Sequence, residues 1–167
     1  MEELDKAGKD FEAGRIFLPQ LIFIAENAKK TLDELEKKSG KSVLKNGHKI
    51  IMATVKGDVH DIGKNIVKSL LESYGYQVID LGKDVPPETI VDCAVEHDVK
   101  LIGLSALMTT TLPPMKETIE LVRERGLDCR VMVGGAVLNP DYAESIGADY
   151  YAKDAKGAVD IAKSLFV

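Results

Sequence analysis

The chain has 167 residues, few aromatic side chains (5%) and no Trp, a composition that suits a parallel α/β domain with a small appendage. Its formal net charge of −5, from 22 basic and 27 acidic side chains, argues against a nucleic-acid partner. No apolar run approaches the roughly 20 residues of a membrane span, and no signal peptide opens the chain. The two cysteines, Cys93 and Cys129, have no metal or redox spacing and indicate reduced thiols, so we expect a cytoplasmic protein without a membrane partner.

Two amphipathic helices are predicted at the N-terminus, over residues 2–13 and 19–37. Their apolar positions repeat with the helical period and are Leu4, Ala7, Phe11, Leu21, Ile24, Ala25, Ala28, Leu32 and Leu35. A pair this short cannot bury both of its faces by itself. We therefore expect a helical hairpin over residues 1–37 with an apolar stripe, followed by a polar, glycine-bearing linker over residues 38–49.

From residue 50 onward, strands and helices alternate in the manner of a parallel sheet. The expected strands are 50–55, 76–81, 101–107, 130–133 and 149–152. The expected helices cover 63–74, start at 87 and at 115, and cover 140–146 and 155–166. This pattern predicts a flavodoxin-like, doubly wound α/β domain over residues 50–167, with a five-stranded parallel sheet.

The loop after the first strand holds a carboxylate and an imidazole two residues apart. Asp58 can accept the proton on one nitrogen of His60 and leave the other nitrogen free to bind a metal. Gly63 lets a bulky ligand approach the backbone where a side chain would collide. A lone loop histidine is more often a solvated or capping residue, so this interpretation depends on what else lies at the same edge of the sheet.

Three further loops reach that edge, because the carboxyl ends of parallel strands meet there. Hydroxyl side chains follow the third strand, Gly134-Gly135 follows the fourth, and Lys153-Asp154-Ala155 follows the fifth. The hydroxyl side chains are Ser105, Thr109, Thr110 and Thr111. Each group also has an ordinary structural explanation, as a helix cap or a tight turn. Their convergence on one edge favours a ligand site.

Three short motifs carry a resemblance to a known family. They are D-x-H-x-x-G at Asp58–Gly63, S-x-L at Ser105–Leu107 and G-G at Gly134-Gly135. In this order and at these intervals, residues 50–166 resemble the cobalamin-binding module of cobalamin-dependent methionine synthase and of related corrinoid methyltransferase proteins.

The resemblance implies cobalamin, in the form of methylcobalamin, as cofactor. His60 would replace the dimethylbenzimidazole of the cofactor as lower ligand to cobalt, and Asp58 would hold the other imidazole nitrogen. Thr111 would complete this relay at a position where serine is more familiar. The detached nucleotide tail would enter a slot beside the sheet. The implied cofactor-binding set, beyond Asp58 and His60, is Gly57, Val59, Asp61, Ile62, Gly63, Ser105, Leu107, Thr109, Gly134, Gly135, Ala155, Phe11, Leu18 and Leu21.

The last three of these residues belong to the predicted hairpin, where residues 11–21 are similar to the helical cap above the corrin. By that likeness Phe11, Leu18 and Leu21 face the methyl group on cobalt; the alternative is that they form the core of the hairpin. The cap of the family is a four-helix bundle, of which this chain holds about half. We therefore expect either a homodimer through residues 1–37 or a hairpin displaced from the corrin.

The implied activity is that of a methyl-carrier module, not catalytically complete alone, with methyl-donor and methyl-acceptor domains or subunits and a reductive activation partner. The favoured interpretation is the corrinoid module of methionine synthase, cut from a longer chain and serving methyltetrahydrofolate and homocysteine. The alternative is a free-standing corrinoid shuttle of a methanol- or methylamine-type methyltransferase system. A non-catalytic cobalamin sensor or storage protein is the third interpretation, and the sensor is disfavoured because we see no DNA-binding segment before the module.

Overall fold

The computed structural model describes residues 2–39 and 47–166. Its centre is a parallel sheet with the strand order β2-β1-β3-β4-β5. The strands are β1 (Lys49–Val55), β2 (Gln77–Val85), β3 (Leu101–Ser105), β4 (Arg130–Gly134) and β5 (Tyr150–Tyr151). The expected flavodoxin-like five-stranded sheet is confirmed.

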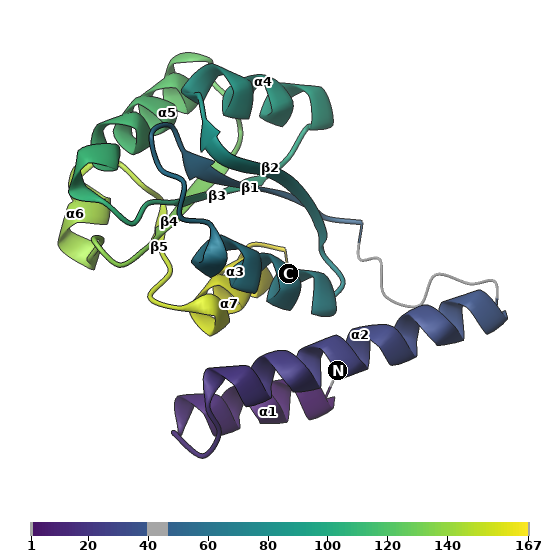
Figure 1. Ribbon diagram of the computed structural model, residues 1–167. Coiled ribbons are helices and arrows are strands. Elements are labelled where there is room, and N and C mark those ends of the chain that lie inside the picture. The colour runs from purple at the N-terminus through teal and green to yellow at the C-terminus, as the bar shows by residue number, and fades with distance from the viewer. Residues whose placement is uncertain (1, 40–46, 167) are drawn as a thin grey trace.

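Helices cover both faces of the sheet (Figure 1). On one face lie α3 (Ile62–Ser73) and α7 (Ala155–Leu165), and on the other lie α4 (Pro87–His97) and α5 (Leu112–Glu124). A short helix, α6 (Pro140–Ser145), lies beside β5. Proline in the first turn starts α4, α5 and α6, while the side chains of Asn139 and Asp154 cap α6 and α7. No helix in the described ranges is both long and apolar enough to cross a membrane.

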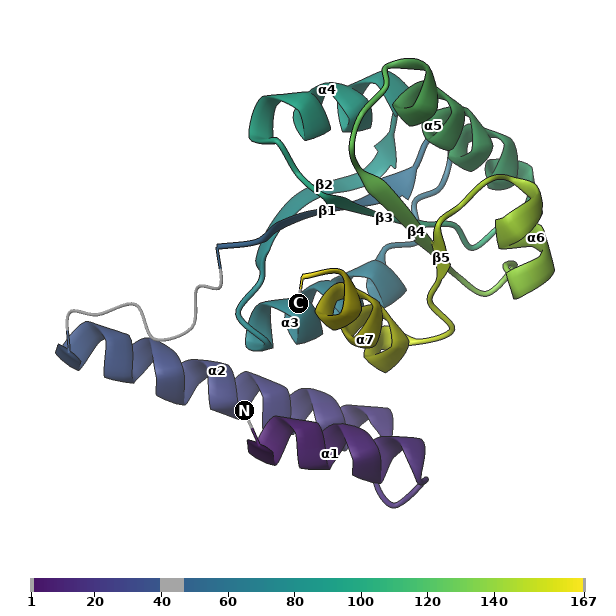
Figure 2. The same ribbon diagram turned by 180° about the vertical axis from the view of Figure 1, so that it is seen from behind.

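The N-terminal hairpin packs on the outer side of α3 and α7. Figure 2 shows α1 (Glu2–Glu12) and α2 (Leu18–Ser39) as a further layer beneath these two helices. Leu4, Ala7, Leu21 and Ala25 are buried in one core with apolar side chains of α3 and α7. The Tyr74 hydroxyl donates to the Leu4 carbonyl at 3.1 Å, which links the two layers.

This packing corrects the expectation of an exposed apolar stripe. The stripe is covered by the α/β domain of the same chain, because α3 and α7 present a complementary apolar surface. Among the described side chains of the hairpin, the large apolar ones that remain exposed are Phe17, Phe23 and Leu35. The homodimer through residues 1–37 stays a prediction, but a stripe without a partner no longer supports it.

Element boundaries differ from the predictions at the linker. Helix α2 runs to Ser39 and β1 starts at Lys49, so the helix and the strand each extend into the expected linker 38–49. Residues 40–46 of that linker lie outside the described residues. The division into 1–37, 38–49 and 50–167 stays a proposal, since the hairpin and the α/β domain share one core.

The second strand is longer than predicted and the third is shorter. Strand β2 was expected to stop before Gly82 but continues to Val85, because two shifts in the β1–β2 register accommodate the turn-prone residues. Strand β3 ends at Ser105, because its next residues turn toward Asp58. Both differences bear on the site described next.

Candidate cofactor-binding site

Asp58 is the buried centre of the loop that follows β1. Gly57, with φ 83°, makes the turn, and the Asp58 amide donates to the Val55 carbonyl at 3.0 Å. This turn carries the Asp58 side chain inward, where none of it is exposed. The sequence predicted a polar loop at the edge of the sheet, and the structure places its carboxylate beneath the surface.

Hydrogen bonds satisfy this buried carboxylate. Oδ1 accepts from the His60 amide at 2.9 Å, and Oδ2 accepts from the Leu107 amide at 2.6 Å. Burial alone would raise the pKa of Asp58, but the bonds from Leu107, His60 and Thr111 outweigh it and hold the pKa well below its usual range. The carboxylate is therefore ionised and can only accept hydrogen bonds.

The ionised carboxylate of Asp58 determines which nitrogen of His60 donates to it. The imidazole Nδ1 lies 2.8 Å from Asp58 Oδ1, and the side chain is 46% exposed. Because the carboxylate can only accept, Nδ1 carries the proton, and in the neutral imidazole Nε2 then has the free lone pair. The pair thus presents one imidazole nitrogen as a ligand at the surface.

Thr111 lies behind the carboxylate. Its buried hydroxyl lies 2.9 Å from Asp58 Oδ2 and 2.8 Å from the Met108 carbonyl, and its single proton can serve one of these oxygens at a time. Thr111 ends the short 3₁₀ helix η1 (Thr109–Thr111). The predicted order His60–Asp58–Thr111 is present as a chain of contacts.

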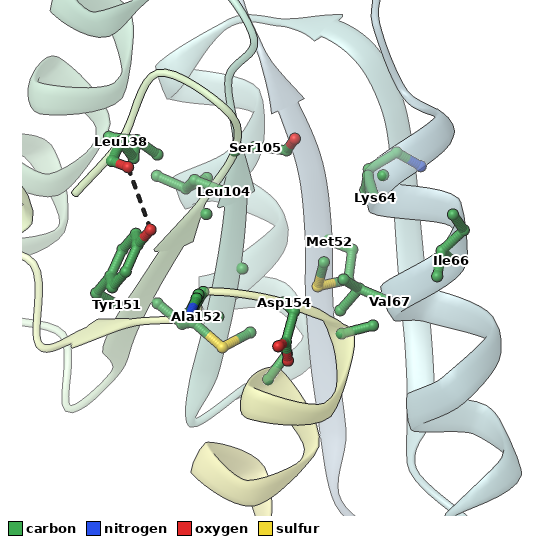
Figure 3. Close-up of a pocket in the computed structure, with 18 of the residues that line it drawn as sticks. Met52, Lys64, Ile66, Val67, Leu104, Ser105, Leu138, Tyr151, Ala152 and Asp154 are labelled. Atoms are coloured by element: carbon green, nitrogen blue, oxygen red, sulfur yellow. Dashed lines mark hydrogen bonds between the residues drawn. The ribbon is translucent and has the colours of Figure 1, made fainter. Parts of the chain in front are cut away.

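A cavity of about 370 Å³ opens beside the loop, between α3, the start of α7 and the carboxyl ends of the central strands. Figure 3 shows Lys64, Ile66 and Val67 of α3 on one side, and Ala152 and Asp154 on the other. Six residues of the predicted set line it: Gly63, Ser105, Gly134, Gly135, Ala155 and Leu18.

The three predicted glycines at this cavity serve different needs. A Cβ on Gly135 would lie 1.9 Å from the Ala106 carbonyl oxygen, and one on Gly134 would lie 3.1 Å from that of Ala152. Close backbone approach requires glycine at position 135, whereas a Cβ at position 134 would be tight and would push the Ala152 carbonyl slightly away. A Cβ on Gly63 would meet nothing within 4 Å, so Gly63 leaves space that a ligand can fill.

Large apolar side chains surround His60 at the surface. Val59 is 55% exposed, Ile62 78% and Leu107 41%, although each belongs to a predicted motif. An exposed apolar patch at the mouth of a cavity is typical of a binding surface. Asp61 is half-buried ahead of α3, and Thr109 is exposed and is not among the residues that line the cavity.

Comparison with known proteins assigns the family. A family model for the B12 binding domain matches residues 48–160. Dimethylamine corrinoid protein 3 from Methanosarcina mazei is 44% identical over 171 residues, covering 97% of this chain and 99% of its own. The chain belongs to the B12-binding corrinoid proteins. Cobalamin is its cofactor.

Solved structures agree with this assignment. A cobalamin-binding protein from Desulfitobacterium hafniense superposes with a TM-score of 0.85 at 37% identity, covering 98% of this chain and 78% of that one. The methanol:cobalamin methyltransferase complex MtaBC from Methanosarcina barkeri gives 0.80 at 32% identity, covering 95% and 61%.

The residues present fit cobalamin. An accessible imidazole Nε2 suits cobalt, the open space at Gly63 suits a macrocycle on the loop, and the cavity suits a buried tail.

The hairpin residues predicted to face the corrin are not all at the cavity. Leu18, at the start of α2, lines it. Leu21 is fully buried in the core shared with α3 and α7, and Phe11 packs partly buried against the same core. Leu21 thus lies in a core that the hairpin shares with α3 and α7, and its contact with the cofactor stays a prediction.

Sequence reasoning missed a buried ion pair at the cavity. Lys64 is 1% exposed, and its Nζ donates to Asp80 on β2 at 2.5 Å and to Asn65 at 2.8 Å. Burial would raise the pKa of Asp80, but the bond from Lys64 reverses this and the pKa is lowered. Two signals were available: Lys64 falls on the apolar stripe of α3 with Val67 and Leu71, and Asp80 interrupts an apolar strand.

Proposed function

We propose that this chain carries a methyl group on cobalamin for a methyltransferase system of the methylamine or methanol type. The observation that carries the proposal is the Asp58–His60 pair, which presents Nε2 beside a cavity in a B12-binding fold. The relatives described above are a dimethylamine corrinoid protein and a methanol:cobalamin methyltransferase complex. They favour the shuttle over the methionine synthase module, which they do not support.

Each residue has a role that follows from its contacts. His60 Nε2 would hold the cobalt of the cofactor, and Asp58 accepts the hydrogen bond from Nδ1, which orients the imidazole. Thr111 and the Leu107 amide hold Asp58 in turn. When bound, cobalamin supplies a cobalt centre that accepts and releases a methyl group.

The cavity accounts for the nucleotide tail of the cofactor. If His60 held the cobalt, the dimethylbenzimidazole would have to lie elsewhere, and the cavity lined by Gly63 and by residues of α3 and α7 would be the place to receive it. Ser105 is a hydroxyl donor on its lining, and Gly134 and Ala155 leave room because they have no side chain or a small one. Val59, Ile62 and Leu107 would offer the corrin an exposed apolar surface.

The proposed partners are supported by a similar solved structure, which is a methanol:cobalamin methyltransferase complex. The methyl donor and methyl acceptor would bind to methyltransferase domains or subunits that dock on this chain. A reductive activation partner restores the cofactor after oxidation.

The ligand assignment is tested with cob(II)alamin. Bound to the wild type, it should show the EPR coupling of one axial nitrogen, and His60→Ala should abolish that coupling while the fold persists. His97→Ala is the matched control, because His97 ends α4 on the opposite face of the sheet. Retained nitrogen coupling in His60→Ala, with benzimidazole excluded by isotope labelling, would refute the assignment.

The methyl donor is tested separately. The methylcobalamin-loaded protein is incubated with a dimethylamine methyltransferase, a methanol methyltransferase, or a methionine synthase barrel pair. We expect exchange with one of the first two only. Exchange with the third alone would restore the methionine synthase interpretation.

A further inference from the structure

The end of strand β2 is joined to the His60 loop by two reciprocal hydrogen bonds. The Gly57 amide donates to Asp84 Oδ1 at 2.7 Å, and the Asp84 amide donates to the Asp58 carbonyl at 2.9 Å. Asp84 therefore contacts both residues of the turn that carries the Asp58 carboxylate inward. Asp84 itself lies outside the sequence motifs that identify the site.

Asp84 adopts a backbone conformation that needs a reason. Its φ of 55° is left-handed, which crowds the Cβ of any residue other than glycine. Among the described residues, the other non-glycine residue with positive φ is Asp98, whose φ of 46° closes the C-terminal end of α4. Asp84 caps no helix. It lies near the second shift in the β1–β2 register, between Ala53 and Val55, where the turn of Gly57 and Asp58 comes within reach.

The other end of the loop is also tied to β2. Lys64, in the first turn of α3, is held by Asp80 at 2.5 Å, and Asp80 Oδ1 also accepts from the Gly82 amide at 2.9 Å. Two aspartates of one strand thus hold the chain on both sides of His60. Between these anchors, the imidazole is fixed by its contact with Asp58.

We propose that Asp84 is a positioning residue for the cobalt ligand: by clamping Gly57 and Asp58 from β2, it fixes where His60 presents Nε2. This rests on the proposed role of His60 as axial ligand. Asp84 itself touches neither the cofactor cavity nor the imidazole. Its effect passes through Asp58, whose position sets that of Nδ1.

Two variants separate the effect of the Asp84 side-chain hydrogen bond from the effects of its backbone conformation and its charge. Asp84→Gly removes the carboxylate but is favoured at positive φ, so its fold should persist. Asp84→Asn removes the charge, tolerates the left-handed conformation and keeps an oxygen that can accept from the Gly57 amide. Asp98→Gly is the matched control, since it makes the same change at the other left-handed aspartate.

The main readout is the EPR spectrum of bound cob(II)alamin, which gives the ratio of molecules without and with the axial nitrogen. Loss of one hydrogen bond should raise this ratio roughly two- to ten-fold in Asp84→Gly. Asp84→Asn and Asp98→Gly should stay within about two-fold of the wild type. An unchanged ratio in Asp84→Gly, or an equal rise in Asp84→Asn, would overturn the proposal.

A second readout needs no cofactor. The ¹⁵N shifts of His60 in the cofactor-free protein report its tautomer, and Asp84→Gly should move them toward the average of the two tautomers. Absence of axial nitrogen in the wild type would contradict the proposed function instead, and the ¹⁵N shifts would still decide the role of Asp84. Unmoved shifts in Asp84→Gly would count against the clamp in that case.

Discussion

The two faces of the sheet are built from the same strands but serve different ends. On the α4/α5 face, β3 and β4 contribute Ile102, Leu104, Val131 and Val133 to a closed apolar core. On the α3/α7 face, the alternate positions of the same two strands include Gly103, Ser105 and Gly134, which line the cavity. Because successive side chains of a strand point to opposite faces, one face can carry small side chains while the other keeps its apolar packing.

The buried charges follow the same division. Lys64 on α3 and Lys156 on α7 are both buried on the side of the cavity, and each is held by a carboxylate. Thr54, on β1, adds a buried hydroxyl without a hydrogen-bond partner among the described atoms. The comparison teaches that the α4/α5 face is closed throughout, whereas the α3/α7 face keeps an apolar core and accepts small and polar residues near the carboxyl ends of its strands, where a ligand can enter.

The largest effect is expected from a cavity made in the closed face. Ile102→Ala should lower the free energy of unfolding by about 2–5 kcal/mol, since Ile102 is fully buried among apolar neighbours. The neighbouring change on the open face, Ser105→Ala, should cost less than about 1.5 kcal/mol. Urea unfolding of the cofactor-free proteins measures both. Equal losses would show that the two faces do not differ in the way described.

The next effect is the loss of cofactor binding when open space is filled. Gly63→Leu places a side chain where the structure leaves room, so the affinity for hydroxocobalamin should fall roughly 100-fold. The fold should be kept, because Gly63 lies in the first turn of α3 at an ordinary φ.

Gly63→Ala serves as the graded control for this change. It should raise the stability of the cofactor-free protein by up to about 1 kcal/mol through helix propensity, while still weakening binding. Spectral titration and urea unfolding give the two quantities. Tight binding of hydroxocobalamin by Gly63→Leu would mean that the ligand does not approach this glycine.

The alternation of apolar strands and helices was sufficient to predict the five-stranded sheet and the edge at which His60 lies. Contacts between distant residues were not predictable in this way. Nothing local in the stripe of Leu21 and Ala25 says that α3 and α7 will cover it. The Lys64–Asp80 pair joins residues of different elements. Glycine is typical of a strand end, so Gly82 predicts the end of β2, but shifts in the β1–β2 register let the strand continue.

A smaller effect is expected from the buried carboxylate at the rim. In Asp58→Asn, an amide group replaces an oxygen that accepts hydrogen bonds, which should destabilise the protein by about 1–3 kcal/mol at pH 7. The pKa of Asp58 is lowered in the folded protein, so its contribution is complete above an unfolded pKa of about 3.9 and is lost as the pH falls further.

The stabilities of wild type and Asp58→Asn should therefore converge as the pH falls below about 4. Urea unfolding at a series of pH values measures the difference, with Asp92→Asn on the exposed side of α4 as the control. A gap that stays constant down to the acid transition would show that the folded carboxylate is not specially stabilised.

The smallest effect is expected at Thr111. Thr111→Val keeps the shape of the side chain and removes only its hydroxyl, which Asp58 Oδ2 and the Met108 carbonyl share. Because the Leu107 amide still donates to the same carboxylate oxygen, the loss should be about 0.5–1.5 kcal/mol, below that of Asp58→Asn. It should raise the fraction of bound cob(II)alamin without axial nitrogen in the same direction as Asp58→Asn. Thr111→Ser keeps the hydroxyl and removes the methyl group that lies near Gly57, so it should match the wild type in the EPR ratio. If Thr111→Ser and Thr111→Val shift that ratio equally, the methyl group and not the hydroxyl is what holds the relay.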